Sequence, residues 1–391
     1  MDHEISGFAL PEFTGVKEAF VQSFVTPGDG AALSVFIDGK PVVDLWGGMA
    51  DARSGAEWRE DTISVIFSST KGLVAILAAR LVEDGLLDYE ARVSDYWPEF
   101  AQAGKQDVRV KHLLSHRSGL SAPREDLTVA DIVDWDAVRR VLERQEPLWT
   151  PGEGFAYHAI TYGWLVGEVV RRVTSMSVGE YFRAVVGDPL GVDAWIGLQA
   201  SELDRVAHLQ VGSTLAALVK AQSGARIPGE IDWLDRAMTL GGALPRELVS
   251  EAGGFNDPLL QQAEIPGAGG IASARALATI WSATVTETYG VRLLRDTTLG
   301  TALLHQTDEA PVFSSPPPYP RWGMGFQLDS PARRYLGASS FGHDGAGGQV
   351  GFADRASRIG FGYVTDLMEA DDNRATRIID ALRDVVGSEP R

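Results

Sequence analysis

Cysteine is absent from this chain of 391 residues. Without a thiol there can be no disulfide bond, no cysteine nucleophile, and none of the zinc or iron–sulfur sites that depend on thiolate ligands. The seven histidines are scattered, and no H-E-x-x-H pair or other cluster of ligands occurs among them. We therefore expect neither a metal centre nor another cofactor.

Positive charge is scarce as well. The net charge is −18, there are only six lysines, and no run is rich in lysine or arginine. Nucleic acids and anionic membrane surfaces both need a basic patch, so neither is an expected partner.

Long hydrophobic runs are also missing. No apolar stretch approaches the ~18–20 residues that span a bilayer, and the first residues, MDHEISGFALPEF, lack the apolar segment of a signal peptide. We expect a soluble, cytoplasmic protein that acts on a small molecule. The sequence leaves the oligomeric state open.

A length of 391 residues allows a large core and two subdomains, and 45% hydrophobic residues is the composition of an ordinary globular protein. Strand patterns lie near both ends of the chain. Residues 31–48 form two β-rich runs joined by Asp38-Gly39-Lys40, a hairpin signal. Residues 62–68 predict a further strand, and short β-like runs separated by glycine turns fill residues 321–328 and 339–366.

Helical periodicity begins at Thr70 and ends near Asp84-Gly85, with Gly85 in the position that favours a left-handed residue. Its apolar face comprises Leu73, Ile76, Leu77 and Leu81. Further helices are predicted over residues 110–120, 129–145, 162–175, 179–193, 272–285 and 371–387, with the fourth stopped by Asp188-Pro189.

Segregated strands and helices predict an α+β fold rather than a doubly wound parallel sheet. We expect one mixed domain, built from residues 1–70 and 265–391, that is split by a mostly helical insertion, residues 71–264.

The stretch FSSTKGLVAI, residues 67–76, places Ser68 three residues before Lys71 at a helix start. That spacing puts both side chains on one face. The serine could attack a carbonyl carbon while its own N–H binds the oxyanion, and a buried lysine would lose its proton more easily. The alternative is a helix cap with Lys71 in solvent. With 26 serines in the chain, the pair alone decides little.

Two other stretches could carry chemistry. In WTPGEGFAYHA, residues 149–159, Tyr157 stands where a loop enters a helix, and a neighbouring ammonium could lower its pKa and make it a base. The alternative is an anchoring tyrosine. In FGHDGAGG, residues 341–348, the glycines suit a backbone that packs closely, and Ala346 N–H could be a second oxyanion donor. The alternative is a plain glycine-rich hairpin.

Together, in this order, SSTK, PGEGFAY and GHDGAGG resemble the motifs of the serine β-lactamase-like fold. KHLLSHRSGL (111–120), DPLGV (188–192) and PGAGGIASAR (266–275) are typical of its class C β-lactamase and carboxylesterase branch. FAYHAITYG (155–163) with LLSHRSGL resembles the family VIII carboxylesterases. The resemblance extends from about residue 30 to the end of the chain. It implies an antiparallel sheet flanked by helices, with the active site at the interface between this sheet domain and the helical domain.

The resemblance implies a nucleophile, Ser68, with Lys71 and Tyr157 sharing the general base and acid roles through an acyl-enzyme. The N–H groups of Ser68 and Ala346 would form the oxyanion hole. Implied substrate contacts are His343, Asp344, Gly345, Phe155 and Trp322, with Phe326 as a further wall. His116 and His158 are expected to be structural.

Two departures from the lactamase pattern favour short neutral carboxylic esters as substrates. The position of the lactamase Tyr-x-Asn asparagine is Ala159, and its Lys-Thr-Gly is His343-Asp344-Gly345. A histidine with an ordinary pKa of ~6.5 replaces a permanent cation. β-Lactams, D-amino-acid peptides and linear amides of the 6-aminohexanoate-oligomer type remain alternatives. An α/β-hydrolase esterase would need a G-x-S-x-G elbow, and none occurs.

Overall fold

The computed structural model describes residues 4–224, 229–313 and 316–387. Its centre is an antiparallel sheet of nine strands in the order β1-β3-β2-β13-β12-β11-β10-β9, with β4 paired to β3. The strands are β1 (Ile5–Ala9), β2 (Gly30–Ile37), β3 (Lys40–Asp51), β4 (Ala56–Glu57), β9 (Arg321–Trp322), β10 (Gln327–Leu328), β11 (Ser340–Asp344), β12 (Val350–Asp354) and β13 (Ile359–Thr365).

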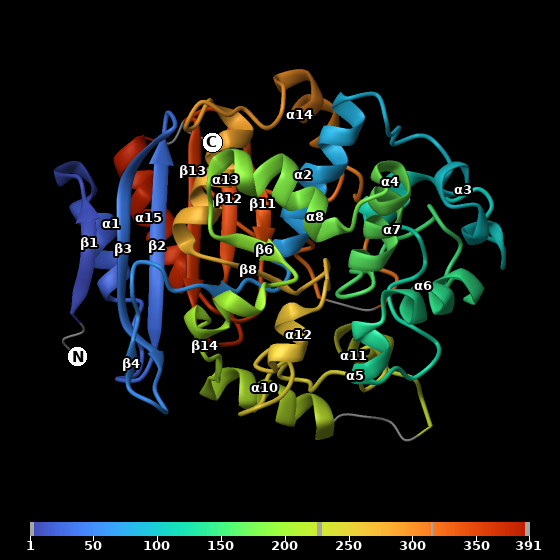
Figure 1. Ribbon diagram of the computed structural model, residues 1–391, viewed down its shortest axis with the longest axis horizontal. Helices are drawn as coiled ribbons and strands as arrows, with labels where there is room; N and C mark the ends of the chain where they lie inside the picture. Colours follow the sequence, from blue (N-terminus) through green and yellow to red (C-terminus); the bar gives the residue numbers. More distant parts are fainter. Residues whose placement is uncertain (1–3, 225–228, 314–315, 388–391) are drawn as a thin grey trace.

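The two ends of the chain meet in this sheet, because β13 pairs with β2 along its whole length (Figure 1). The predicted hairpin joins β2 to β3: Ile37 pairs with Lys40. Asp38 and Gly39 between them both have positive φ, of 50° and 75°. These angles match the twist of the strands, which is why an Asp-Gly pair suits this turn.

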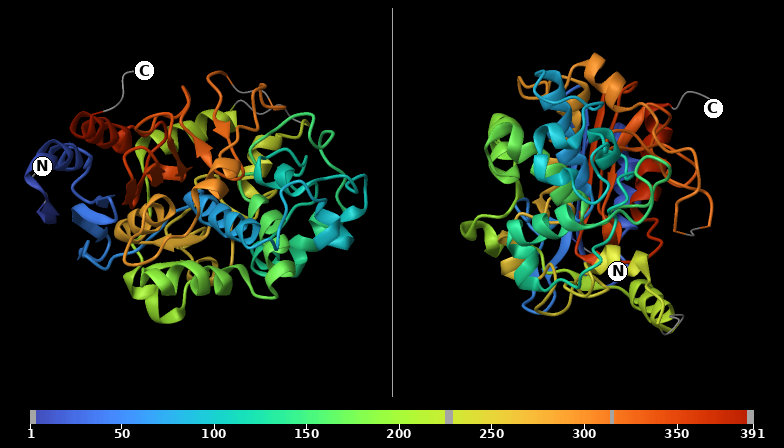
Figure 2. Two further views of the ribbon diagram at one scale, coloured as in Figure 1. Left: turned by 90° about the horizontal axis from the view of Figure 1, so that it is seen from above. Right: turned by 90° about the vertical axis from the view of Figure 1, so that its right-hand side faces the viewer.

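Helices cover both faces of the sheet (Figure 2). On one face, α1 (Thr14–Val21) and α15 (Arg374–Val386) pack with Phe352, Phe361 and other apolar residues into a buried cluster. On the other face lies α13 (Ala274–Val285). It approaches closely because β13 has glycines there: a Cβ on Gly360 would lie 2.2 Å from Ala278 O.

A second region, on the right in Figure 1, is mostly helical. It contains α3 (Val93–Tyr96), α4 (Val110–Leu114), α5 (Val129–Val133), α6 (Trp135–Arg144), α7 (Tyr162–Thr174), α8 (Val178–Phe182) and α9 (Asp188–Leu190). Between the sheet and these helices runs α2 (Ser69–Glu83), whose residues Ser69 to Ala79 are all buried.

A single hydrophobic core extends from Phe341 and Val364 of the sheet, through α2, to Leu165 and Val170 of α7. The division into a sheet domain and an inserted helical domain therefore remains a proposal, because the two regions share their interior.

The segment between α9 and α13 returns toward the sheet. It carries α10 (Ser213–Gly224), α11 (Trp233–Thr239) and α12 (Pro258–Gln262), and α14 (Asp296–Ala302) follows α13. Short strands in and beside this segment form two small sheets: β5 (Ser64–Val65), β8 (Gly270–Ala272) and β6 (Ala194–Ile196) in one, and β14 (Leu367–Met368) with β7 (Gln210–Val211) in the other.

Three predictions about elements are wrong in detail. The helix expected over 129–145 is two helices, because Asp134 is extended (ψ 103°) and accepts a hydrogen bond from Asp136 N. Helical turns pass through Pro189 and end at Gly191, since the proline lies in the first turn of α9, where its missing N–H is not needed. The strand over 62–68 has only two residues, Ser64 and Val65.

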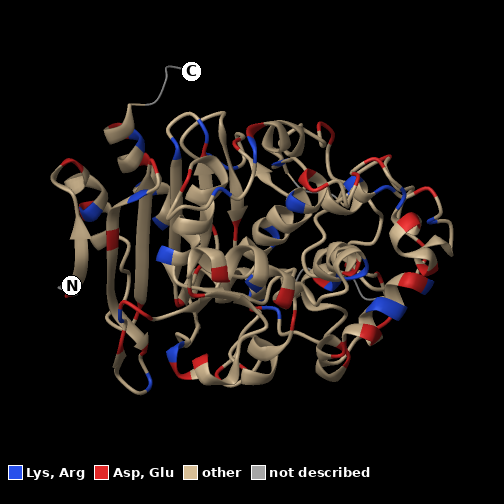
Figure 3. Cartoon of the chain, turned by 45° about the horizontal axis from the view of Figure 1, so that its top comes forward, with Lys and Arg blue, Asp and Glu red and all other residues tan. Residues whose placement is uncertain are grey.

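Charged residues are spread along the whole cartoon of Figure 3, and lysines and arginines lie among acidic residues in that view. Within the described ranges, no helix is both long and apolar enough to cross a membrane.

Candidate active site

Ser68 stands at the start of α2, after a tight bend from β5. The residue before it, Phe67, has a positive φ of 44°, which is unusual for a bulky side chain and stores strain next to Ser68. Phe67 is held there by a T-shaped contact with Phe255, at 5.4 Å between ring centroids. Ser68 is partly exposed, and its hydroxyl caps no N–H of the described helix. The capping interpretation of this serine is therefore wrong.

Lys71 is completely buried below Ser68. Its Nζ lies 3.0 Å from Ser68 Oγ and donates to two backbone carbonyls, Ala159 O and Gly267 O, each at 2.6 Å. Burial lowers the pKa of Lys71 well below its ordinary value, since the ammonium loses its hydration. The interpretation of Lys71 as a solvent-exposed lysine is also wrong.

Tyr157 lies over Lys71, with Nζ 4.8 Å from the ring centroid. Burial raises the pKa of Tyr157 above its ordinary value, and a hydrogen bond with Ser68 opposes the shift only in part. The expected lowering of this pKa is therefore wrong. The ammonium form of Lys71, which was expected to lower the pKa of Tyr157, is itself destabilised by burial. Tyr157 is therefore a neutral phenol that can donate its proton.

The end of β11 closes the site from the side of the sheet. Ser69 Oγ donates to His343 O at 2.9 Å, which fixes β11 against α2. A Cβ on Gly345 would lie 2.2 Å from Ile66 O, so only glycine allows this approach. The two contacts bring the next residue, Ala346, toward the start of α2.

The N–H groups of Ser68 and Ala346 are both available to a ligand. Neither donates a hydrogen bond to any residue in the described ranges. Both residues are partly exposed, while Lys71 and His343 are buried. Two such N–H groups beside a serine can stabilise an oxyanion.

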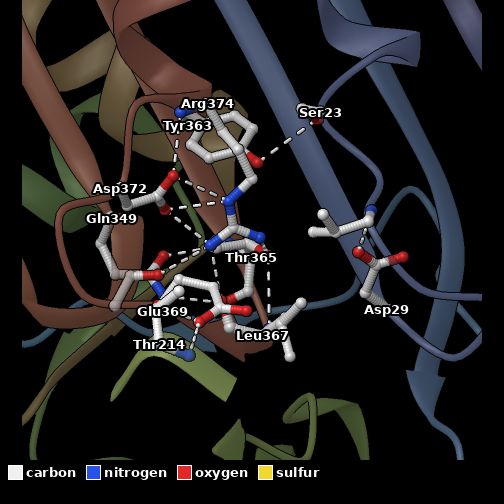
Figure 4. A network of polar contacts seen from close by, with 12 residues as sticks. Ser23, Asp29, Thr214, Gln349, Tyr363, Thr365, Leu367, Glu369, Asp372 and Arg374 are labelled. Atoms are coloured by element: carbon white, nitrogen blue, oxygen red, sulfur yellow. Dashed lines mark hydrogen bonds and ion pairs between the residues drawn. The ribbon is translucent and has the colours of Figure 1, made fainter. Parts of the chain in front are cut away.

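The turn that carries Ala346, η5 (Ala346–Gly348), is held by Arg374, whose guanidinium lies beside Asp372 in Figure 4. Arg374, only 4% exposed, donates to Gly347 O at 3.1 Å and to Leu367 O at 2.7 Å. The same guanidinium pairs with Asp372, at 2.6 Å between Nη2 and Oδ2. The buried pair thereby anchors the turn to the start of α15.

His343 faces the site, but it is not the titrating group that the sequence suggested. Burial and the charge on Lys71 lower its pKa to about 3, while the bond to Asp344 O, 2.7 Å from Nδ1, raises it slightly. The prediction of an ordinary histidine pKa is therefore wrong, and His343 is neutral at physiological pH. Since Nδ1 must donate to the carbonyl, Nε2 carries a lone pair, and no described residue donates to it.

Asp344 is directed away from Ser68. Successive side chains of a strand point to opposite faces, and the Asp344 carboxylate binds Arg333 Nε at 2.7 Å and Tyr335 OH at 3.3 Å. Burial raises its pKa. In the structure this carboxylate holds β11 to the Arg333–Tyr335 segment, and its contact with a substrate stays a prediction.

Aromatic rings enclose Tyr157. Trp322 stacks on it, at 5.4 Å and 22° between the rings, and His343 lies 5.2 Å from Trp322. Of the other predicted walls, Phe155 is buried and its carbonyl accepts from Val312 N at 2.8 Å. Phe326 packs in the core against Trp281 and Phe341, so its assignment as a site wall is wrong.

His116 and His158 connect the loops around Tyr157, as expected of structural residues. His116 Nδ1 accepts from His158 N at 3.2 Å, and His158 Nδ1 lies 2.7 Å from Ala156 O. His158 Nε2, 2.8 Å from Ser118 Oγ, must then accept from that hydroxyl. Burial lowers the pKa of His158 to about 3.

Residues 19–383 match the protein-family model described as Beta-lactamase. The chain belongs to the beta-lactamase family. It is 33% identical over 368 residues to the Mycobacterium tuberculosis protein named Esterase/beta-lactamase LipL. The aligned region covers 92% of this chain and 82% of that protein.

Solved structures that are similar to this chain include a carboxylesterase. A family VIII carboxylesterase is 37% identical, with a TM-score of 0.86 and coverage of 98% of this chain and 100% of that one. EstA from Arthrobacter nitroguajacolicus Rue61a is 30% identical, with a TM-score of 0.82 and coverage of 99% of both chains. The beta-lactamase-like fold and the resemblance to family VIII esterases are thus confirmed.

The sequence did not single out Gly267 as a contact of Lys71. This residue belongs to the PGAGG segment, and a Cβ on the facing Gly163 would lie 2.2 Å from Gly267 N. Thr70 is a second omission, since its Oγ1 accepts from Gly270 N at 2.8 Å and so fixes the same segment beside α2. The density of glycines in residues 266–270 was the available signal.

Proposed function

We propose that this protein is a serine carboxylesterase that hydrolyses short-chain neutral esters through an acyl-enzyme on Ser68. The observation that carries the proposal is the position of Lys71 Nζ, 3.0 Å from Ser68 Oγ and bound to two carbonyl oxygens. A neutral amine has two N–H groups, which the carbonyls accept, and one lone pair, which then faces the serine hydroxyl.

In the first step, Ser68 Oγ attacks the acyl carbon and its proton passes to Lys71 Nζ. The carbonyl oxygen becomes an oxyanion and accepts hydrogen bonds from Ser68 N–H and Ala346 N–H. As the C–O bond breaks, Tyr157 protonates the departing alkoxide and regains a proton from Lys71. The acyl group stays on Ser68 Oγ.

In the second step, a water molecule attacks the acyl-enzyme. Lys71, again neutral, takes a proton from the water through Tyr157, and the carboxylic acid leaves as Ser68 is reprotonated. Both steps use the same three side chains, so one site completes the hydrolysis.

The lining favours a neutral substrate. Ala159 offers no side-chain hydrogen bond, and His343 carries no charge at physiological pH, so neither can pair with the carboxylate of a β-lactam. Trp322, stacked on Tyr157, supplies the apolar contact that an acyl chain or leaving group needs. The esterase names of several relatives support the same substrate class.

A second activity, on β-lactams, is supported by the name of one relative, Esterase/beta-lactamase LipL. The acyl-transfer steps would be the same, and the difference would lie in substrate binding. We expect it to be weak in this chain, because neither Ala159 nor the neutral His343 supplies a cation for the lactam carboxylate.

The test compares p-nitrophenyl acetate, butyrate and octanoate with nitrocefin, for the wild type and Ser68→Ala. We expect turnover of the short esters that is lost in Ser68→Ala, with slow nitrocefin hydrolysis. Nitrocefin turnover equal to ester turnover would contradict the substrate assignment, and ester turnover retained by Ser68→Ala would contradict the nucleophile.

A further inference from the structure

A cavity of about 450 Å³ lies at the far end of the edge strands from Ser68. Its lining includes Arg321 of β9, Leu328 of β10 and Ser340, where β11 begins. His343 is three residues further along β11, about 10 Å away at the rise of an extended strand. The cavity is therefore separate from the candidate active site.

The cavity also faces away from that site. Arg321 and Trp322 are consecutive residues of β9, so their side chains point to opposite faces of the sheet. Trp322 stacks on Tyr157, whereas Arg321 lines the cavity.

Positive charge is concentrated here, in a chain whose net charge is −18. Three arginines, Arg321, Arg334 and Arg355, are among the residues that line the cavity. Arg321 and Arg355 form no side-chain hydrogen bond or ion pair with another described residue, and Arg334 has only a long contact, 3.9 Å, to Asp329 Oδ2. Of the other arginines in the described ranges, only Arg59 is equally without a partner.

Within the described ranges, the carboxylates near the cavity form no ion pair with Arg321 or Arg355. Asp329 Oδ1 accepts from Tyr335 N at 2.8 Å. Asp354 is 2% exposed and accepts from the hydroxyls of Ser339 and Ser340, at 2.8 and 2.7 Å. Asp308 is paired with His305 of the lining, at 2.9 Å. The guanidinium N–H donors of Arg321 and Arg355 therefore remain available.

The rest of the lining is partly apolar, with Leu303, Leu328, Pro331 and Ala338 beside the arginines. A volume near 450 Å³ falls within the range of ~300–1,000 Å³ that small-molecule sites occupy. Arginine forks bind carboxylate and phosphate oxygens in pairs. An apolar wall beside a pair of such forks suits a ligand with an anionic head and a short hydrocarbon part.

We propose that this cavity is a binding site for a small amphipathic organic anion, a carboxylate or a phosphate monoester. Arg321 and Arg355 hold its charged head, and the side chains of Leu303, Leu328 and Pro331 contact its hydrocarbon part. The proposal does not depend on the esterase function, because none of these residues contacts Ser68, Lys71 or Tyr157 in a described interaction.

Isothermal titration calorimetry with octanoate and with hexyl phosphate tests the site, and the tighter of the two identifies the head group. We expect Arg321→Gln/Arg355→Gln to weaken binding at least 10-fold, while Arg59→Gln, a partnerless arginine outside this cavity, leaves it unchanged. Uncharged octanamide and inorganic phosphate alone should each bind at least 10-fold more weakly than the better anion.

Three results would overturn the proposal. The first is the absence of millimolar or tighter binding of both anions to the wild type. The second is an equal loss of affinity in Arg59→Gln, which would indicate nonspecific attraction. The third is binding that persists in the double variant but disappears once a fluorophosphonate has modified the catalytic serine, which would place the anion at the active site. Circular dichroism checks that the double variant is folded, and the single variant Arg355→Gln should weaken binding in the same direction.

Discussion

The proposed ester hydrolysis depends on one lysine that the fold shields from water. Lys71 is buried, and the only polar atoms within hydrogen-bond distance of its Nζ in the described ranges are Ala159 O, Gly267 O and Ser68 Oγ. Burial penalises the charged form of the amine, and the two carbonyls orient its N–H groups. The lone pair of the neutral amine is thereby directed toward Ser68.

Removing this amine should therefore disable the nucleophile. We expect Lys71→Met to lower kcat/KM for p-nitrophenyl butyrate by about 10²–10⁴-fold, the usual contribution of a general base. Lys220→Met, at the exposed face of α10, is the matched control and should be neutral. A Lys71→Met variant that is folded by circular dichroism and retains more than a tenth of the activity would show that another group accepts the proton.

The pH dependence of kcat/KM should report the ionisation of the same Lys71 amine. The neutral fraction of Lys71 grows as pH rises through its lowered pKa, so kcat/KM should rise with pH and level off well below pH 10.5. His343, with a pKa of about 3, cannot produce a limb in the neutral range. We expect His343→Gln to leave the midpoint of the limb in place. A midpoint that moves or disappears in this variant would assign the titration to the histidine.

At the scale of single residues, the sequence predicted which residues form the site better than it predicted their burial and pKa values. The spacing of Ser68 and Lys71 and the place of Tyr157 were recognisable, because motifs record which residue types occur together. The pKa directions of Tyr157 and His343 were not, since they depend on burial by Trp322 and other distant segments. The direction of the Asp344 side chain followed only from the strand it occupies.

Among the elements, the end of β11 and the turn after it set the second oxyanion donor. Gly345 packs on Ile66 with no room for a Cβ, whose nearest neighbour would be Ile66 O at 2.2 Å. The backbone near Ala346 must therefore shift if this glycine is replaced.

We expect Gly345→Ala to lower kcat for butyrate hydrolysis at least 10-fold, with a smaller effect on KM, because an oxyanion donor acts mainly in the transition state. Gly337→Ala is the matched control, since a Cβ there would meet no atom within 4 Å. Equal activity in the two variants would show that catalysis does not depend on the position of η5.

The Arg374–Asp372 pair that holds η5 leads to a prediction about stability. Arg374 and Asp372 are buried partners, with 4% and 9% of their side chains exposed. Arg374→Met leaves a buried carboxylate without its cation, which costs about 3–5 kcal/mol in such pairs. We expect urea unfolding to show that loss, and Arg374→Met/Asp372→Asn to recover part of it. A double variant no more stable than the single one would mean that the carboxylate is not the source of the cost.

At the scale of elements, the sequence predicted helices and strands correctly where the hydrophobic pattern or the turn signal was strong. It missed short breaks between elements and the helices of weakly patterned segments. The helix from Thr70 to Asp84 and the β2–β3 hairpin follow local signals, and both are present. The break at Asp134 depends on one side chain capping a new helix, and α10 to α12 lie in a segment with weak patterning. Their arrangement comes from tertiary packing, which local propensity does not record.

At the scale of the whole molecule, burial of neutral histidines links stability to pH. In the folded chain the pKa values of His158 and His343 are about 3, whereas an exposed histidine titrates near 6.5. Between these values the unfolded chain binds more protons, so stability increases with pH across this window and is complete above it.

We expect the free energy of unfolding to fall by about 2 kcal/mol per buried histidine between pH 7 and pH 5. Urea unfolding at the two pH values measures it. His158→Gln should reduce the difference. Equal stability of the wild type at pH 7 and pH 5 would contradict the buried neutral state of these side chains.

The central claim is that Lys71 activates Ser68 as the nucleophile, and covalent labelling tests it most directly. The folded protein is treated with a fluorophosphonate, and the modified residue is located by peptide mass spectrometry. The account predicts one adduct, on Ser68, that forms at least 100-fold more slowly in Lys71→Met. An adduct on another serine, or labelling of Ser68 at the same rate in both proteins, would contradict it.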